Sequence, residues 1–119
     1  MNTKKILLIS SDKDLSGIVR ISALTLTKLN CQVTIEESVD PDEVRKKSSA
    51  ANLDMIIIDN DSGSGDTLGL INDLRSSFKK KIILLHSTPV EREKIFQAGC
   101  DSIMTKDEFK RVINNILVF

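Results

Sequence analysis

Five short stretches of the chain have the hydrophobic pattern of β-strands. Four are almost continuous apolar runs, which are typical of strands in a parallel sheet covered on both faces. The fifth alternates polar and apolar residues and is rich in β-branched side chains, which predicts a strand at the edge of the sheet. The apolar runs cover residues 6–9, 55–58, 82–85 and, more weakly, 102–104, and the alternating segment covers residues 31–35.

Helical patterns fill the intervals between these strands. Apolar residues recur three and four positions apart, as they do on one face of an amphipathic helix. The first such row holds Leu15, Ile18, Val19, Ala23, Leu26 and Leu29, a later row holds Leu68, Ile71 and Leu74, and the last holds Phe109, Val112, Ile113 and Ile116.

Residues typical of helix ends mark the same intervals. Ser11 followed by Asp14 predicts a start of the capping-box type for the first helix. The sequences Asp-Pro-Asp-Glu at residues 40–43 and Thr-Pro-Val-Glu at residues 88–91 each combine a cap residue, a proline in the first turn and a glutamate three positions after the cap. Gly99 is placed to end the helix that the second of these signals begins.

The strict alternation of strand and helix predicts a doubly wound α/β fold. Such a fold has a five-stranded parallel sheet with five helices on its two faces, joined by right-handed crossovers. The chain has 119 residues, which is the size of one ordinary domain. Because no linker, repeat or low-complexity segment interrupts the pattern, we expect a single domain over residues 1–119.

Charge and cysteine content narrow the classes of function. The seventeen basic and seventeen acidic residues cancel, so no overall field attracts nucleic acid or an anionic membrane, and neither is expected as a partner. The first apolar run is too short for a signal peptide and no segment is long enough to span a bilayer, which favours a cytoplasmic location. Cys31 and Cys100 lack CxxC neighbours and are expected to be reduced, with Cys100 buried.

Polar residues capable of chemistry follow four of the predicted strands. In an open α/β sheet, the carboxyl ends of parallel strands meet at one edge, and ligands bind there. An aspartate and a lysine at two strand ends of such a sheet are therefore expected to lie close together. The residues are Ser10, Ser11 and Asp12 after the first strand, Asp59 after the third, His86, Ser87 and Thr88 after the fourth, and Thr105 and Lys106 after the fifth.

The chain resembles the receiver domains of bacterial two-component response regulators over essentially all of its length. The resemblance is carried by KILLISSD at residues 5–12, LDMIIID at 53–59, KIILLHS at 81–87 and QAGCDSIMTK at 97–106. It implies a flavodoxin-like receiver fold with strand order 2-1-3-4-5. It also implies that Asp59 is the phosphoacceptor position and that Lys106 contacts the phosphoryl group, because a carboxylate can form an acyl phosphate and an ammonium can offset its charge.

The metal position of the family is altered. Ser10 and Ser11 stand where the resemblance implies an acidic pair that holds Mg²⁺. Mg²⁺ is a hard cation that proteins hold mainly with carboxylates and water, so the two serines predict weak or absent Mg²⁺ binding. Asp12, Asp59 and Asp61 remain as weak metal candidates. Phosphoryl transfer depends on this ion, and no other cofactor is expected.

The switch positions of the family are altered as well. His86 stands where the resemblance implies a hydroxyl, and Ile103 stands where it implies an aromatic residue. Two prolines of the family pattern are replaced, by Gly63 and Asp107.

His86 allows three interpretations. In the sharpest, His86 and Lys106 both lie near Asp59 and neutralise its carboxylate directly, without a metal ion. Alternatively, His86 is a partly exposed imidazole at a strand end with no special role. In the third interpretation, Ser87 or Thr88 supplies the missing hydroxyl through a shift in register.

Three classes of function are compatible with these residues. The first is an atypical, pseudo-receiver-like domain in phosphorelay signalling, a protein-interaction module rather than an enzyme, which works without normal Mg²⁺-dependent phosphorylation. The second is a working receiver that a histidine kinase phosphorylates on Asp59. The third is a flavodoxin-like binder of a flavin or nucleotide, but the acidic loop at residues 59–66 lacks the glycine patterns of phosphate-binding loops. The joint loss of metal ligands, switch hydroxyl and switch aromatic favours the first.

The resemblance also implies partners. The docking surface would be the face formed by the fourth helix, fifth strand and fifth helix, around residues 90–97 and 107–118. The partner would be a histidine kinase or an output domain. A homodimer through the same face is also compatible with the resemblance.

Overall fold

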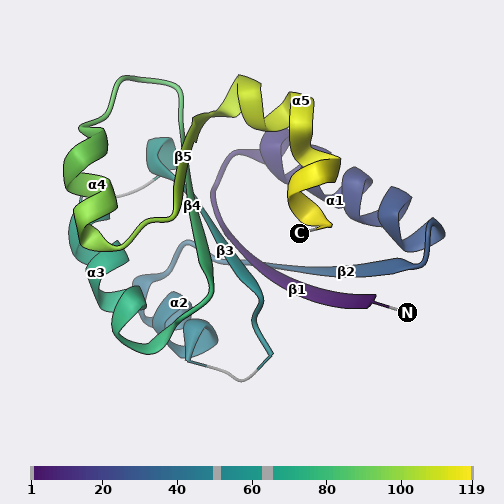
Figure 1. Cartoon of the computed structure of the whole chain (residues 1–119), viewed down its shortest axis with the longest axis horizontal. Coiled ribbons are helices and arrows are strands. Elements are labelled where there is room, and N and C mark those ends of the chain that lie inside the picture. The colour runs from purple at the N-terminus through teal and green to yellow at the C-terminus, as the bar shows by residue number, and fades with distance from the viewer. Residues whose placement is uncertain (1, 50–51, 63–65, 119) are drawn as a thin grey trace.

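The computed structural model describes residues 2–49, 52–62 and 66–118, which form one five-stranded parallel sheet flanked by helices (Figure 1). All five predicted strands are confirmed, and the strand order β2-β1-β3-β4-β5 is the predicted doubly wound order. The alternating segment forms an edge strand, as expected, because β2 pairs only with β1. The strands are β1 (Asn2–Ile9), β2 (Cys31–Glu37), β3 (Met55–Asp59), β4 (Lys81–His86) and β5 (Ser102–Thr105).

Five α-helices connect the strands, and a short 3₁₀ helix follows β3. Figure 1 shows α1 and α5 together on one face of the sheet and α2, α3 and α4 on the other. No helix in the described ranges is long and apolar enough to cross a membrane. The helices are α1 (Lys13–Lys28), α2 (Pro41–Ser48), η1 (Asn60–Ser62), α3 (Thr67–Ser77), α4 (Arg92–Ala98) and α5 (Lys106–Leu117).

Two predicted helix starts are wrong. The N-cap of α1 is Asp12 rather than Ser11, because the Asp12 carboxylate accepts from the backbone N–H groups of Asp14 and Leu15. Helix α4 begins at Arg92, with no side-chain cap, and not at the Thr-Pro signal. The Thr88 carbonyl, which would accept the first helical bond there, lies 2.7 Å from Nδ1 of His86 instead.

Other helix ends follow the sequence signals. The Asp40 carboxylate accepts from the N–H of Asp42 at the start of α2. Gly99 ends α4 with a φ of 120°, a left-handed conformation that glycine adopts without steric cost. Both cysteines are free and Cys100 is buried, as expected.

The sheet separates two hydrophobic cores, because successive side chains of a strand point to opposite faces. Met55 and Ile57 of β3 pack with α1 and α5, whereas Ile56 and Ile58 pack with α2, α3 and α4. Each fully buried aliphatic side chain contributes about 1.5–3 kcal/mol. This alternation also decides which side chains at the strand ends can meet.

Candidate functional site

Lys106, Asp12, Asp59 and Asp61 meet at the carboxyl edge of the sheet, and we refer to them as the Lys106 cluster. The Nζ atom of Lys106 lies 3.0 Å from Oδ2 of Asp59 and 3.1 Å from Oδ2 of both Asp12 and Asp61. Only 11% of the Lys106 side chain is exposed. The predicted meeting of strand-end aspartate and lysine is therefore present in the structure.

Four different elements position the cluster. Asp12 is the N-cap of α1, Asp59 ends β3, Asp61 lies in η1, and Lys106 is the first residue of α5. A capping box formed by Thr105 and Glu108 fixes the start of α5, since each side chain bonds the other residue's backbone N–H. The single ammonium thus joins α5 to β3 and α1.

The carboxylate of Asp59 is buried and fully hydrogen bonded. Its Oδ2 accepts from the hydroxyls of Ser10 at 2.7 Å and Ser62 at 2.8 Å, in addition to the Lys106 ammonium. Its Oδ1 accepts from the backbone N–H of Asp61 at 2.9 Å. The side chain has no exposed surface. A buried charge is tolerated when it is paired and hydrogen bonded, and this one satisfies both conditions.

Ser62 is a site residue that the sequence reasoning missed. Its hydroxyl donates to Asp59 and also accepts from the backbone N–H of Ser11 at 3.0 Å. The Ser10 hydroxyl accepts from the N–H of Asp12 at 3.0 Å. The two serines therefore connect the β1–α1 loop to η1 across the Asp59 carboxylate. The only signal in the sequence was a hydroxyl three residues after a strand-end aspartate, which is too common to single out Ser62.

The contacts within the cluster shift the pKa values of Lys106, Asp12 and Asp61. Burial of the Lys106 ammonium disfavours its charge, but bonds with Asp59, Asp61 and Asp12 outweigh this and raise its pKa above the ordinary range. The pKa of Asp12 is lowered by the backbone N–H of Leu15 and by Lys106. Burial alone would raise the pKa of Asp61, but hydrogen bonds from Ser87 and Lys106 lower it.

His86 lies outside the cluster, so the expectation that it neutralises Asp59 is wrong. Nδ1 of its imidazole bonds the Thr88 carbonyl, and Nε2 is buried without a hydrogen-bond partner among the described residues. The interpretation of an exposed imidazole is wrong too, because only 7% of the residue is exposed. The residue after β4 that does reach the cluster is Ser87, whose backbone N–H donates to Oδ1 of Asp61 at 3.3 Å.

The remaining degenerate positions have ordinary structural surroundings. Ile103 is buried in the core cluster beneath α3 and α4. Its carbonyl accepts from Nη2 of Arg92 at 3.1 Å. Ser11 is exposed, and its backbone N–H donates to the Ser62 hydroxyl. Gly63, which replaces a proline of the family pattern, lies outside the described residues.

The receiver resemblance implies a Mg²⁺ ion, and the donors present do not suit one. The Nζ atom of Lys106 is within 3.1 Å of one oxygen of each carboxylate in the cluster, so an ammonium already occupies the point where they converge. Ser10 offers a hydroxyl that is already engaged with Asp59. Within residues 2–49, 52–62 and 66–118, no group of three His, Cys, Asp or Glu residues is arranged to hold a metal.

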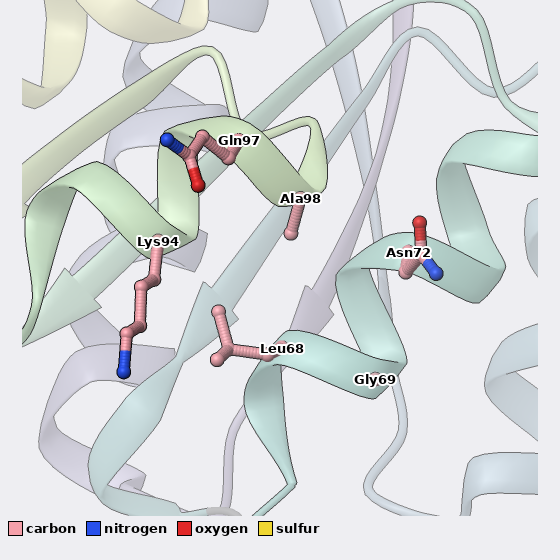
Figure 2. Close-up of a pocket in the computed structure, with 6 residues that line it drawn as sticks. All are labelled: Leu68, Gly69, Asn72, Lys94, Gln97 and Ala98. Carbon is pink, nitrogen blue, oxygen red and sulfur yellow. The ribbon is translucent and has the colours of Figure 1, made fainter.

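A pocket of about 350 Å³ lies between α3 and α4, away from the cluster (Figure 2). Figure 2 shows Leu68 of α3 pointing toward α4, below Ala98 and beside the Lys94 side chain. None of the Lys106 cluster residues lines this pocket. The chemistry of the strand ends and the hollow on the surface are therefore two separate features.

No protein-family model matches the chain, and no curated protein matches it by sequence. Solved structures do match it over nearly its whole length. A two-component response regulator from Clostridium difficile is 19% identical with a TM-score of 0.73, over 96% of this chain and 95% of that one. A CheY-like receiver domain protein from Methanospirillum hungatei is 13% identical with a TM-score of 0.75, over 98% and 94% of the two chains.

The receiver domain of a Francisella response regulator is 22% identical with a TM-score of 0.70, over 97% of this chain and 96% of that one. At these identities the likeness shows the fold. The chain has the α/β fold of response regulator receiver domains, as the resemblance of its motifs implies.

Proposed function

We propose that the chain is an atypical receiver domain, a protein-interaction module of two-component signalling that works without Mg²⁺-dependent phosphorylation. The observation that carries this proposal is the state of the Asp59 carboxylate. It is buried, bonded by three donors on Oδ2 and one on Oδ1, and neutralised by an ammonium of the same chain.

The hydrogen bonds to Asp59 are unfavourable for phosphoryl transfer in two ways. The nucleophilic oxygen must present a free lone pair in line with the leaving group, and the transferring charge must be stabilised, usually by Mg²⁺. Here the Ser10 and Ser62 hydroxyls and Lys106 occupy Oδ2, and the side chain has no exposed surface. For Oδ2 to attack a phosphoryl donor, at least one of these three groups would have to give up its bond to that oxygen.

A working receiver is the second candidate, and two observations favour it. Lys106 lies 3.0 Å from Asp59, which is where the resemblance puts the lysine that contacts the phosphoryl group. Ser87 reaches the cluster through Asp61 and could supply a hydroxyl in place of His86. Both candidates share the receiver fold and differ in whether Asp59 accepts phosphate.

Beryllofluoride, a stable mimic of the phosphoryl group, separates the two candidates. Amide NMR spectra of the ¹⁵N-labelled chain would be recorded with and without beryllofluoride and low-millimolar Mg²⁺. We expect no shifts at Asp59, Ser87 and Lys106. Saturable shifts at these residues, or addition of one phosphoryl group by acetyl phosphate in intact-mass spectra, would establish a working receiver instead.

A gain-of-function variant provides the matched control. Restoring the acidic pair as Ser10→Asp/Ser11→Asp supplies the carboxylates that Mg²⁺ requires. We expect Mg²⁺ to shift amide signals of this double variant at concentrations that leave the wild-type spectrum unchanged. Equal responses of the two proteins would show that the serines do not limit metal binding.

The proposed partner is a protein, either a histidine kinase or an output domain, that docks on the face of α4, β5 and α5 in the cytoplasm. Support comes from two large apolar side chains exposed there, Phe96 of α4 at 44% and Val112 of α5 at 41%. Exposed aromatic side chains are enriched among the residues that anchor protein partners. Phe96→Asp should weaken capture of such a partner, and Lys110→Asp on the same helix as Val112 serves as a polar control.

A further inference from the structure

Helix α1 carries a row of residues on the side that faces away from the sheet, all of them exposed except the half-buried Gly17. Asp14, Gly17, Ile21, Leu24 and Lys28 recur at alternating spacings of three and four, and we call them the α1 outer row. Ile21 and Leu24 are 66% and 65% exposed. The opposite side of the helix packs against the core. Its buried residues are Leu15, Val19, Ser22, Ala23 and Leu26.

No close contact with another described residue explains the glycine at position 17. A Cβ atom built at this position would meet nothing within 4 Å, and its φ is not in the left-handed region. Glycine inside a helix is less stable than alanine by about 0.5–1 kcal/mol. A glycine in an exposed helix row lets another helix approach closely, which gives this residue a use outside the chain.

The outer row is complementary to its own reverse. Asp14 and Lys28 lie seven residues before and after Ile21, and Gly17 and Leu24 lie on either side between them. When a second copy of α1 lies antiparallel with Ile21 against Ile21, each Leu24 lies beside the other copy's Gly17, one residue from the directly opposed position. Each Asp14 then faces the other copy's Lys28. A two-fold contact requires this kind of self-complementary surface.

The charged ends of the row are available for such a contact. Among the described residues, neither the Asp14 carboxylate nor the Lys28 ammonium forms an ion pair. Groups beside the row are already satisfied. Nε of Arg20 donates to Glu37 at 2.8 Å, and the Thr25 hydroxyl donates to the Ile21 carbonyl at 3.0 Å. Arg20 and Thr25 would therefore keep these hydrogen bonds when the row is covered.

We propose that the chain self-associates as a two-fold dimer through antiparallel α1 helices, with the α1 outer row at its centre. The contact is separate from the α4–β5–α5 face. One helix per copy makes a smaller interface than the roughly 1,200–2,000 Å² of stable complexes, so the dimer is weak and exchanges rapidly. The dimer does not depend on the phosphorylation state of Asp59.

Sedimentation equilibrium from about 10 µM to about 1 mM measures the association, a range suited to a weak dimer. The full chain should dimerise within this range, and Ile21→Asp should raise the dissociation constant at least about tenfold, because it puts two carboxylates at the two-fold axis. Val112→Asp, on the α4–β5–α5 face, is the matched control and should leave the dissociation constant unchanged. A wild-type chain that stays monomeric throughout, or association lost in Val112→Asp and kept in Ile21→Asp, overturns the proposal.

A charge swap tests the antiparallel register. Asp14→Lys and Lys28→Asp should each weaken the dimer several-fold, since each puts like charges together, and the double variant should recover most of the loss. Failure of the double variant to recover contradicts the pairing of Asp14 with Lys28. Circular dichroism of each variant, with thermal unfolding, checks that α1 is intact, because both charges also interact with the helix dipole.

Discussion

His86 at the end of β4 and Lys106 directly after β5 are the two residues that the sequence predicts beside Asp59, and their surroundings in the structure are opposite. At the β5 end, the Lys106 ammonium bonds three carboxylates that come from three other elements. At the β4 end, the His86 imidazole bonds Thr88 two residues away, and its Nε2 is buried with no hydrogen-bond partner in the described part of the chain. The Lys106 ammonium is therefore part of the site, whereas the His86 imidazole is buried outside it.

The alternation of side chains along the strands explains the difference. Asp59 lies opposite Leu85 in the β3–β4 register, and directly opposed residues share a face. Leu85 belongs to the core beneath α1 and α5. His86, one residue further, continues the row of Leu84 and points to the other face. Ser87 returns to the face of Asp59 and reaches Asp61. The position of His86 at the end of β4 therefore suggests that it lies near Asp59, but the alternation of side chains points its imidazole to the other face of the sheet.

The largest effect is expected from Lys106→Met. This variant leaves the buried Asp59 carboxylate and its two acidic neighbours without a counter-charge, and loss of one partner from a buried ion pair costs about 3–5 kcal/mol. Urea unfolding at pH 7 measures the free energy of unfolding. Lys13→Met, at the exposed first residue of α1, is the control and should change it by less than about 0.5 kcal/mol. Equal losses in both variants would show that the cluster contributes no special stability.

Acid should weaken the cluster next most strongly. The pKa values of Asp12 and Asp61 are lowered in the folded state, so their contribution is complete above about pH 4, the ordinary value. It is lost as the pH falls through the folded values. The raised pKa of Lys106 gives the opposite sign, with its contribution present below about pH 10 and lost at higher pH.

Free energies of unfolding measured at several pH values test the expected loss of stability in acid. The wild-type chain should lose more stability than Asp61→Asn when the pH falls from neutral to acid, because the variant has one lowered carboxyl fewer to protonate. Parallel curves for the two proteins would mean that Asp61 does not contribute through its charge.

The fold and the Asp59–Lys106 contact of the cluster could be predicted from the sequence, for a clear reason. Strand order, strand positions and the meeting of Asp59 with Lys106 follow from hydrophobic periodicity and from the edge at which parallel strands end. What the sequence could not predict depends on local geometry. Ser62 joins the site because η1 turns its hydroxyl back toward Asp59. Asp12 rather than Ser11 caps α1 because its carboxylate bonds two backbone N–H groups.

Ser62→Ala should lower the free energy of unfolding moderately, and it tests how much the Ser62 hydroxyl stabilises the buried Asp59 carboxylate. The variant removes one hydrogen bond to a buried carboxylate, which is worth about 1.5–3 kcal/mol, and also an acceptor for the Ser11 N–H. Ser11→Ala is the matched control, because Ser11 bonds Ser62 through its backbone N–H, and it should leave the unfolding free energy nearly unchanged. If both alanine variants are neutral, the Ser62 hydroxyl does not stabilise the buried charge.

His86→Leu should have the smallest effect and tests the comparison most directly. The substitution removes the bond to the exposed Thr88 carbonyl, which water can replace, and it also removes the unsatisfied Nε2 atom. Replacing a buried polar group by an apolar one of similar size is close to neutral when its partner stays hydrated, so the free energy of unfolding should change by less than about 1 kcal/mol. Signals of Lys106 and Asp59 in NMR spectra should stay in place, because the imidazole lies on the other face of the sheet. A loss comparable to that of Lys106→Met would mean that the β4 end belongs to the same charged network as the β5 end, and that alternation alone does not separate them.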